Sequence, residues 1–227
     1  MMNYDLTPIL LSFKLALVTA VILFLLAIPL AYWLAFSQRK YRPIIEIFIN
    51  LPLVLPPTVL GFYILLLFSP QNFLGSILET YFNIRVVFTF TGLVIGSVIF
   101  SLPFMVNPVK SGLQGLPSSL MEASYTLGKS PWETLRKVLL PNIKPALLTG
   151  VVMSFAHTIG EFGVVLMVGG SIPSETRVAS IAIYNEVEAL NYQTAHIYSL
   201  ILISVAFGAF WAIHLFNRKT NQPAFLK

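Results

Sequence analysis

The stretch Ile9–Phe36 reads ILLSFKLALVTAVILFLLAIPLAYWLAF and contains one charged residue, Lys14. About 20 apolar residues are enough for a helix to cross the roughly 30 Å hydrocarbon core of a bilayer. The apolar run is continuous and does not alternate with polar residues, as a half-buried strand would. Backbone in lipid must also form its hydrogen bonds within its own segment. The stretch therefore predicts a transmembrane α-helix.

Four further apolar stretches follow, and together they predict about five spans, over residues 9–36, 44–68, 87–106, 146–168 and 195–216. Of the 227 residues, 56% are hydrophobic and only 10% are charged, and the mean hydropathy is +0.81. A soluble domain carries about 25% charged residues. We therefore expect an all-α membrane protein with one transmembrane domain over residues 1–227. Met1–Phe13 lacks Lys and Arg and precedes an apolar run too long for a signal peptide, so we expect no cleaved signal.

The basic residues gather on one side of the predicted spans. Eleven of the 14 Lys and Arg residues fall in the loops after the first and third spans or after the fifth: Arg39, Lys40, Arg42, Lys110, Lys129, Arg136, Lys137, Lys144, Arg218, Lys219 and Lys227. By the positive-inside rule, the N-terminus is expected outside and the C-terminus in the cytoplasm. We interpret these clusters as topology signals and expect no nucleic-acid partner. The absence of Cys excludes disulfides and thiol chemistry.

One predicted cytoplasmic loop, residues 109–144, is long and amphipathic. Its centre, Met121–Lys137, reads MEASYTLGKSPWETLRK. A Ser three residues before Glu122 resembles a capping box that opens a first short helix, and Gly128 suits its C-terminal cap. Ser130 and Pro131 suit the N-cap and first position of a second helix.

The second loop helix is expected to carry an apolar stripe and to end at Pro141 before the fourth span. The stripe consists of Trp132, Leu135, Val138 and Leu139. A loop of this length with its own helices is usually functional. It either lies on the lipid surface or docks onto another protein.

The loop resembles the cytoplasmic motif of ATP-binding-cassette (ABC) importer permeases, which has the form E-A-A, three residues, G, nine residues, I-x-L-P. This chain has Glu122-Ala123-Ser124, then Gly128, then Val138-Leu139-Leu140-Pro141, with Ser124 and Val138 as departures. The resemblance implies that the loop seats in a cleft of a separate ATPase subunit. The expected coupling residues are Glu122, Ala123, Ser124, Gly128, Trp132, Val138, Leu140 and Pro141.

The tripeptide Gly128-Lys129-Ser130 also ends like a P-loop. A P-loop needs a glycine five residues before its final Gly, where this chain has Ala123, and a preceding strand, which is not expected here. We therefore expect ATP on the partner subunit, no cofactor on this chain, and no enzymatic activity of its own.

Two predicted spans contain residues that are unusual in lipid. The second span includes Leu51–Gly61, LPLVLPPTVLG, whose prolines break helical hydrogen bonding and either form a packing kink or line a path. The fourth includes His157–Gly163, HTIGEFG, in which His157 lies one turn from Glu161 and could pair with it. A buried carboxylate suggests a structural pair, a gate or a proton relay. The candidate path or gate residues are Pro52, Pro56, Pro57, Gly61, His157, Gly160, Glu161 and Gly163.

These two segments, together with Ile172–Arg177 (IPSETR), resemble the permease branch for molybdate, sulfate and tungstate, and the ETR residues favour molybdate. The resemblance implies a multi-pass homodimer in the bacterial inner membrane that works by alternating access. It also implies two ATPase subunits and an external oxyanion-binding protein. Arg85, Glu175 and Arg177 are candidate contacts for that protein or ordinary loop charges.

Several alternatives remain at this point. Sulfate, thiosulfate or tungstate could replace molybdate as the substrate. A stand-alone secondary transporter or channel, or a membrane scaffold, are the alternatives from other classes. Against a secondary transporter, the chain has no internal repeat and few membrane carboxylates.

Overall fold

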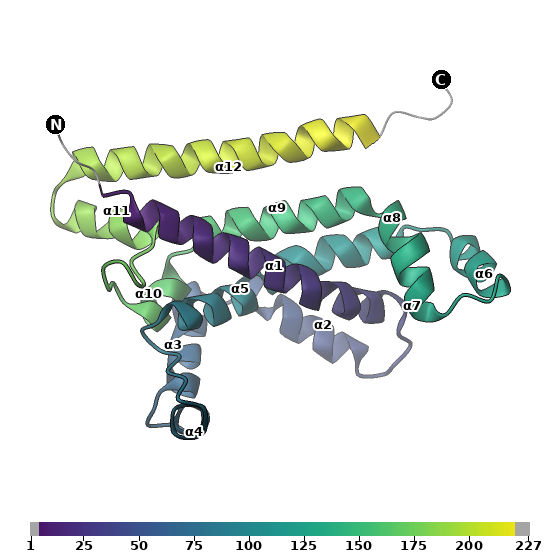
Figure 1. Cartoon of the computed structure of the whole chain (residues 1–227), viewed down its shortest axis with the longest axis horizontal. Helices are drawn as coiled ribbons and strands as arrows, with labels where there is room; N and C mark the ends of the chain where they lie inside the picture. The colour runs from purple at the N-terminus through teal and green to yellow at the C-terminus, as the bar shows by residue number, and fades with distance from the viewer. Residues whose placement is uncertain (1–4, 221–227) are drawn as a thin grey trace.

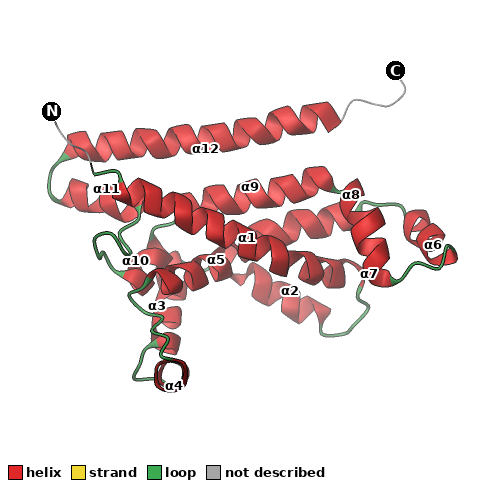
Figure 2. Ribbon diagram, in the orientation of Figure 1, coloured by secondary structure: helices red, strands yellow, loops and turns green. Residues whose placement is uncertain are grey.

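The computed structural model describes residues 5–220, with side chains described to Phe216, and this part of the chain is helical without any strand (Figure 2). The predicted all-α class is confirmed. The elements are α1 (Thr7–Phe36), α2 (Arg42–Asn50), the 3-10 turn η1 (Leu51–Leu53), α3 (Pro57–Phe68), α4 (Phe73–Phe82), α5 (Phe90–Gln114), α6 (Ser118–Thr126), α7 (Pro131–Thr134), the π-helical η2 (Leu135–Leu139), α8 (Leu140–Asn142), α9 (Lys144–Gly160), α10 (Gly163–Gly169), α11 (Ala179–Glu188) and α12 (Tyr192–Thr220).

The helices α1, α5 and α9 form a bundle along the long axis of the molecule, and α12 runs beside α9 (Figure 1). The loop helices α6 and α7 lie at one end of this bundle, whereas α3 and α4 project near the other. Among the described residues, three helices are long and apolar enough to cross a bilayer: α1, α5 and Tyr192–Phe216 of α12. The number rises to five if each of two bent helix pairs counts as one span, which agrees with the predicted number.

The predicted second span is not one straight helix. Arg42–Leu53 and Pro57–Phe68 are bent by 112° against each other. The cause is local, because Pro52, Pro56 and Pro57 each lack the N–H that a continuous helix would use. The predicted bend at the prolines is therefore present, but it is sharper than a kink within one span.

The predicted fourth span is also interrupted. The helix α9 ends at Gly160, Glu161 adopts an extended conformation with φ −67° and ψ 134°, and α10 begins at Gly163. The predicted span over 146–168 is therefore not one uninterrupted helix. At its other end, α9 is bent by 81° from the segment Pro131–Asn142.

The third span extends further than predicted, since α5 continues to Gln114 despite Pro103 and Pro108 inside it. The reason is burial: Val109 and Leu113 are fully buried and belong to the core. The loop predicted over 109–144 therefore begins only after Gln114. Two helices in the predicted outer loops, α4 and α11, were not foreseen.

The largest core cluster joins the membrane helices to the cytoplasmic loop. It contains Leu23, Ala27, Ala31 and Leu34 of α1, Met105, Val106, Val109 and Leu113 of α5, and Leu135, Leu139 and Ile143 from the loop. A displacement of the loop is therefore passed directly to α1 and α5, because close-packed interiors have little room to absorb it.

Candidate functional site

The cytoplasmic loop folds as two short helices that meet at Gly128. The Lys129 N–H donates to the Ser124 carbonyl at 3.1 Å, and the Gly128 N–H donates to the Tyr125 carbonyl at 2.9 Å. This pair of bonds is the Schellman arrangement, in which the residue after the helix adopts a left-handed conformation. Gly128 has a φ of +72°, so the predicted C-terminal cap is confirmed.

A buried hydrogen bond holds the two loop helices together. The hydroxyls of Ser124 on α6 and Thr134 on α7 lie 2.8 Å apart, and the residues are only 4% and 0% exposed. Ser124 occupies the position of the second Ala in the permease motif. Because Ala has no hydroxyl, this departure from the motif adds a hydrogen bond that the usual residue could not form. The two helices of the hairpin are therefore joined by a buried hydrogen bond as well as by the turn at Gly128.

The second loop helix begins as predicted. The Ser130 hydroxyl accepts a hydrogen bond from the Glu133 N–H at 3.2 Å, and Pro131 occupies the first turn. The Glu133 carboxylate accepts a hydrogen bond from Lys137 at 2.8 Å and lies 4.0 Å from Lys129. The hydrogen bond from Lys137, together with the positive charges of both lysines, lowers the pKa of Glu133 below its usual value.

Three details of the loop differ from the prediction. No side chain caps the first helix, which begins at Ser118 after Pro117, so the capping box with Glu122 is wrong. Pro141 lies inside α8, and the chain leaves helical geometry at Ile143 instead. Trp132 does not join the buried stripe, because its side chain is 63% exposed.

The tip of the loop presents apolar side chains to its surroundings. Leu127 is 78% exposed, Trp132 63% and Tyr125 42%. Glu122 and Ala123 are exposed on the same hairpin, while Val138 and Leu140 are half-buried at its base. The loop thus combines a surface suited to a protein partner with an anchor in the core.

The helix break after α9 lines a pocket of about 620 Å³. Five of the predicted path residues meet there: Pro57, His157, Gly160, Glu161 and Gly163. The other three predicted residues, Pro52, Pro56 and Gly61, do not line it. The pocket also includes Thr58 and Phe100, which the sequence reading missed.

His157 does not pair with Glu161, so that prediction is wrong. The His157 Nδ1 lies 2.9 Å from the Ser101 hydroxyl, which also lies 3.0 Å from the Thr158 hydroxyl. The imidazole ring stacks on Phe104 with its centroid 4.0 Å away. Because the packing of α5 against α9 fixes these contacts, His157 turns toward α5 and away from the following turn.

The Glu161 side chain is 4% exposed, and within the described part of the chain neither carboxylate oxygen makes a hydrogen bond of normal geometry. The buried Ser97 hydroxyl on α5 makes none either, but it lies close enough to the Glu161 carboxylate to interact with it. The Glu161 carbonyl accepts a bond from the Ser180 hydroxyl at 2.5 Å, which ties the break to α11. Ser97 and Ser101 lie four residues apart on one helical face, a spacing that could have marked this polar stripe in the sequence.

Two glycines near the break allow close helix contacts. A Cβ at Gly163 would lie 2.7 Å from the Pro57 Cβ and 3.2 Å from the Thr58 nitrogen. A Cβ at Gly61 would lie 2.7 Å from the Met167 Cβ. A Cβ at Gly160 would meet nothing within 4 Å. Gly61 and Gly163 therefore hold α3 against α10, and Gly160 has no such packing role.

The outer candidates are dispersed. Arg85 and Glu175 are exposed, and Arg177 is half-buried. The Ile172–Arg177 segment forms a compact turn in which the buried Thr176 hydroxyl donates to the Gly169 carbonyl at 2.7 Å and accepts from the Ile172 N–H at 3.0 Å. The turn therefore has a structural role in addition to any contact role of its charges.

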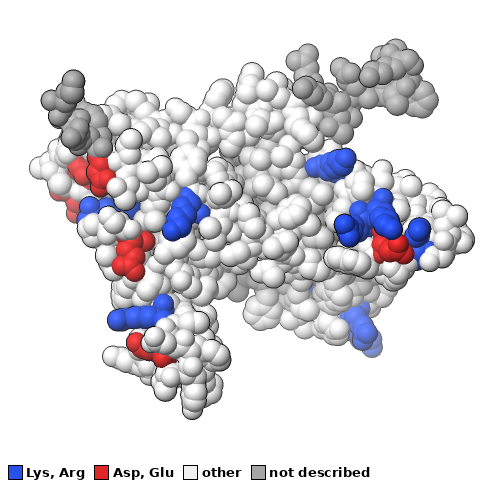
Figure 3. All heavy atoms as spheres, viewed as in Figure 1, with Lys and Arg blue, Asp and Glu red and all other residues white. Residues whose placement is uncertain are grey.

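Charge is unevenly placed on the molecule. Basic side chains gather at the end that carries α6 and α7, whereas most acidic ones in this view lie at the opposite end (Figure 3). The predictions for Arg218, Lys219 and Lys227 lie outside the side chains that the structure describes.

The chain resembles known transport proteins over nearly its whole length. It is 38% identical over 95% of its length to the molybdenum transport system permease protein ModB of Azotobacter vinelandii, of which 96% is covered. It is 34% identical over 78% of its length to a probable sulfate transport system permease protein of Chlorella vulgaris, of which 66% is covered. A bacterial alginate ABC transporter solved with a pentasaccharide-bound periplasmic protein has a chain of the same fold, with a TM-score of 0.77 and 16% identity over 98% of this chain and 81% of that one.

The family described as "Binding-protein-dependent transport system inner membrane component" matches residues 27–222. That match includes the bent pairs, the loop hairpin and the helix break. With its several apolar helices, this multi-pass membrane protein belongs to that family and is an ABC importer permease.

Proposed function

We propose that this chain is the membrane-spanning subunit of an ATP-driven importer for molybdate. In this proposal two copies form the path, two ATPase subunits dock on the loops, and an external binding protein delivers the anion. The N-terminus faces outside, the C-terminus faces the cytoplasm, and the membrane is the inner membrane of a bacterium. The chain itself carries no ATPase activity.

The loop hairpin is the observation that supports coupling of the membrane helices to the ATPase subunits. Its apolar tip, formed by Tyr125, Leu127 and Trp132, is exposed, and its base is buried with α1 and α5. A hairpin that lay on lipid along its predicted apolar stripe would expose Leu135 and Leu139, but both are inside the core. The hairpin is therefore better suited to bind a protein partner and transmit its movement than to lie on the lipid surface.

The choice of molybdate rests on the relatives. The alignment with the molybdenum permease covers nearly all of both chains at 38% identity. The alignment with the sulfate permease covers only 66% of that protein, at 34% identity. The spans present no cluster of Lys or Arg to hold an anion tightly. Recognition would then rest with the binding protein, and weak binding along the path favours release.

In this proposal, the break at Glu161 is the element that moves. The segment between α9 and α10 interrupts the helix, lines the pocket, and connects through α9 to the loop. Rocking of the loop hairpin would tilt α9 and open or close the pocket. Alternating access of this kind needs a bistable element, and a helix break is a suitable one.

The test is uptake in proteoliposomes that contain the permease, its ATPase and its binding protein. We expect molybdate uptake that requires both ATP and the binding protein, strong competition by tungstate, and weak competition by sulfate. Uptake without ATP would support a stand-alone transporter instead. Equal competition by sulfate would favour the sulfate alternative.

A further inference from the structure

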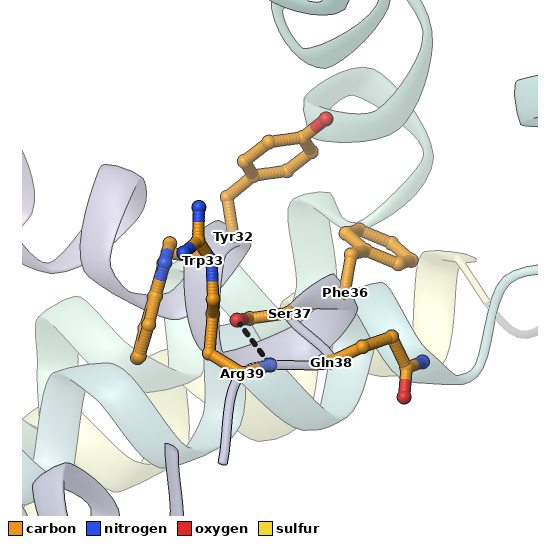
Figure 4. Close-up of a pocket in the computed structure, with 6 residues that line it drawn as sticks. All are labelled: Tyr32, Trp33, Phe36, Ser37, Gln38 and Arg39. Carbon is orange, nitrogen blue, oxygen red and sulfur yellow. Dashed lines mark hydrogen bonds between the residues drawn. The ribbon is translucent and has the colours of Figure 1, made fainter. Parts of the chain in front are cut away.

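A second pocket, of about 400 Å³, lies at the end of α1 nearest the loop hairpin (Figure 4). Its walls are the aromatic side chains of Tyr32, Trp33 and Phe36 and the start of the following turn, Ser37–Arg39. In the close-up, the Arg39 side chain extends alongside the Trp33 ring. The pocket therefore has an apolar wall and a cationic rim.

The aromatic wall is held in place by ring contacts. The Trp33 ring stacks on Tyr41 with centroids 5.7 Å apart and an interplanar angle of 16°. Tyr32 and Phe36 meet edge to face at 5.3 Å. These contacts tie the end of α1 to the start of α2, so the pocket does not depend on a partner to keep its shape.

The rim carries positive charge that nothing in the described chain neutralises. Arg39, Lys40 and Arg42 lie within four residues and form no ion pair there, and the turn contains no acid. Other lysines on the same side are paired, as in Lys110 with Glu46. Arg42 instead donates to the Ser37 carbonyl at 3.4 Å, which leaves its charge uncompensated.

The pocket lies at the depth of lipid headgroups, because the apolar run of α1 ends at Phe36 and the charged turn follows at once. Trp and Tyr are typical of this interfacial depth, and basic residues there attract anionic lipids. We propose that this pocket binds an anionic phospholipid. The phosphate is held by the Arg39–Arg42 turn, and the glycerol and upper acyl chain lie against Trp33 and Phe36.

The structure provides a reporter for the test. The chain has three Trp residues, at positions 33, 132 and 211. In the full-length chain carrying Trp132→Phe and Trp211→Phe, Trp33 is the single fluorophore. After reconstitution, its quenching by brominated phosphatidylglycerol is compared with that by brominated phosphatidylcholine, which gives the relative affinity of the site for the two lipids.

We expect phosphatidylglycerol to be preferred at least tenfold, since each basic residue near the surface contributes about fivefold. Arg39→Gln with Lys40→Gln should reduce the preference to about fivefold or less, which is the contribution expected of Arg42 alone. Both side chains are exposed and outside the buried core, so this pair leaves the core packing unchanged. The matched control, Arg136→Gln with Lys144→Gln, removes two exposed and unpaired charges on the same side and should retain the preference.

Equal quenching by the two lipids in the parent protein overturns the proposal, as does a preference that removal of Arg39 and Lys40 leaves undiminished. Loss of the preference in the control pair also overturns it, because the effect would then be a general surface charge. If bound ATPase shields Trp33 from both lipids, the pocket is a protein contact and the proposal fails.

Discussion

Gly128 offers the sharpest test of the docking hairpin, because its substitution isolates backbone geometry. Its φ is +72°, and a Cβ added there would meet no atom within 4 Å. The Cβ of a Val at this position would therefore meet no atom, and the main effect comes from holding a β-branched residue in the left-handed region. That cost is about 1–2 kcal/mol or slightly more. It corresponds to a reduction of about five- to thirtyfold in the population of the observed hairpin.

Gly128→Asn is the matched control, since Asn tolerates the left-handed conformation. We expect Gly128→Val to weaken binding of the ATPase subunit to the purified permease by about tenfold, and Gly128→Asn by less than about threefold. The affinity is measured by titrating labelled ATPase, with molybdate uptake as a second readout. Cleavage by trypsin after Lys129 reports the hairpin conformation without the partner.

Each outcome separates the local geometry from the docking proposal. If Val and Asn weaken binding equally, a direct steric contact and not the backbone conformation is responsible, and the reasoning fails. If Val increases cleavage after Lys129 but leaves ATPase affinity unchanged, the hairpin geometry is right and the proposed docking site is wrong.

Three further predictions follow from the same structure. Ser124→Ala or Thr134→Val should each cost about 1–3 kcal/mol in thermal unfolding of the purified permease, because each leaves one buried hydroxyl unpaired, and the double variant should cost less than the sum of the two. Additive losses would mean that the hydroxyls do not depend on each other. Gly163→Ala should lower the free energy of unfolding by about 1–3 kcal/mol through the close contact with α3, whereas Gly160→Ala should leave it nearly unchanged. Equal effects of the two substitutions in the same thermal unfolding measurement would contradict this packing. In an NMR titration, the Glu133 carboxyl should have a pKa below 4.5, and this pKa should rise in 1 M salt because salt screens the lysine charges. The pKa of Glu133 is lower in the folded protein than in the unfolded one. The stability that its pairing contributes is therefore fully present above the unfolded pKa and is lost as the pH falls through the folded pKa. A pKa at or above 4.5 would exclude the lysine contacts in solution.

Much of the loop was predictable because its signals are local. The cap at Gly128 and the start of the second helix at Ser130 depend on residues within one turn, and both are present as predicted. The prediction of a capping box failed at Glu122 because Pro117 already sets the start of that helix. Trp132 was misplaced because helical periodicity identifies an apolar face but not whether the chain itself covers it.

The intramembrane site was predictable only in part. The prolines marked the bend in the second span, since those residues act on their own backbone, but the break after Gly160 was not predicted. The partner of His157 was wrong because the choice between Glu161 one turn away and Ser101 on α5 depends on how two helices pack. The same packing continues α5 through Val109 and Leu113, where the sequence alone indicated a loop.

The sequence by itself determined that the chain is helical and lies in a membrane, that its second span bends at the prolines, and which loop carries a docking motif. These properties follow from hydropathy, from missing backbone donors and from local caps, all of which act over a few residues. Only the tertiary structure decided that Leu135 and Leu139 join the core of α1 and α5, and that the Glu161 side chain lies buried at the edge of a pocket. Both depend on contacts between residues far apart in the chain, because the apolar faces of membrane helices are too alike for the sequence to specify which ones meet.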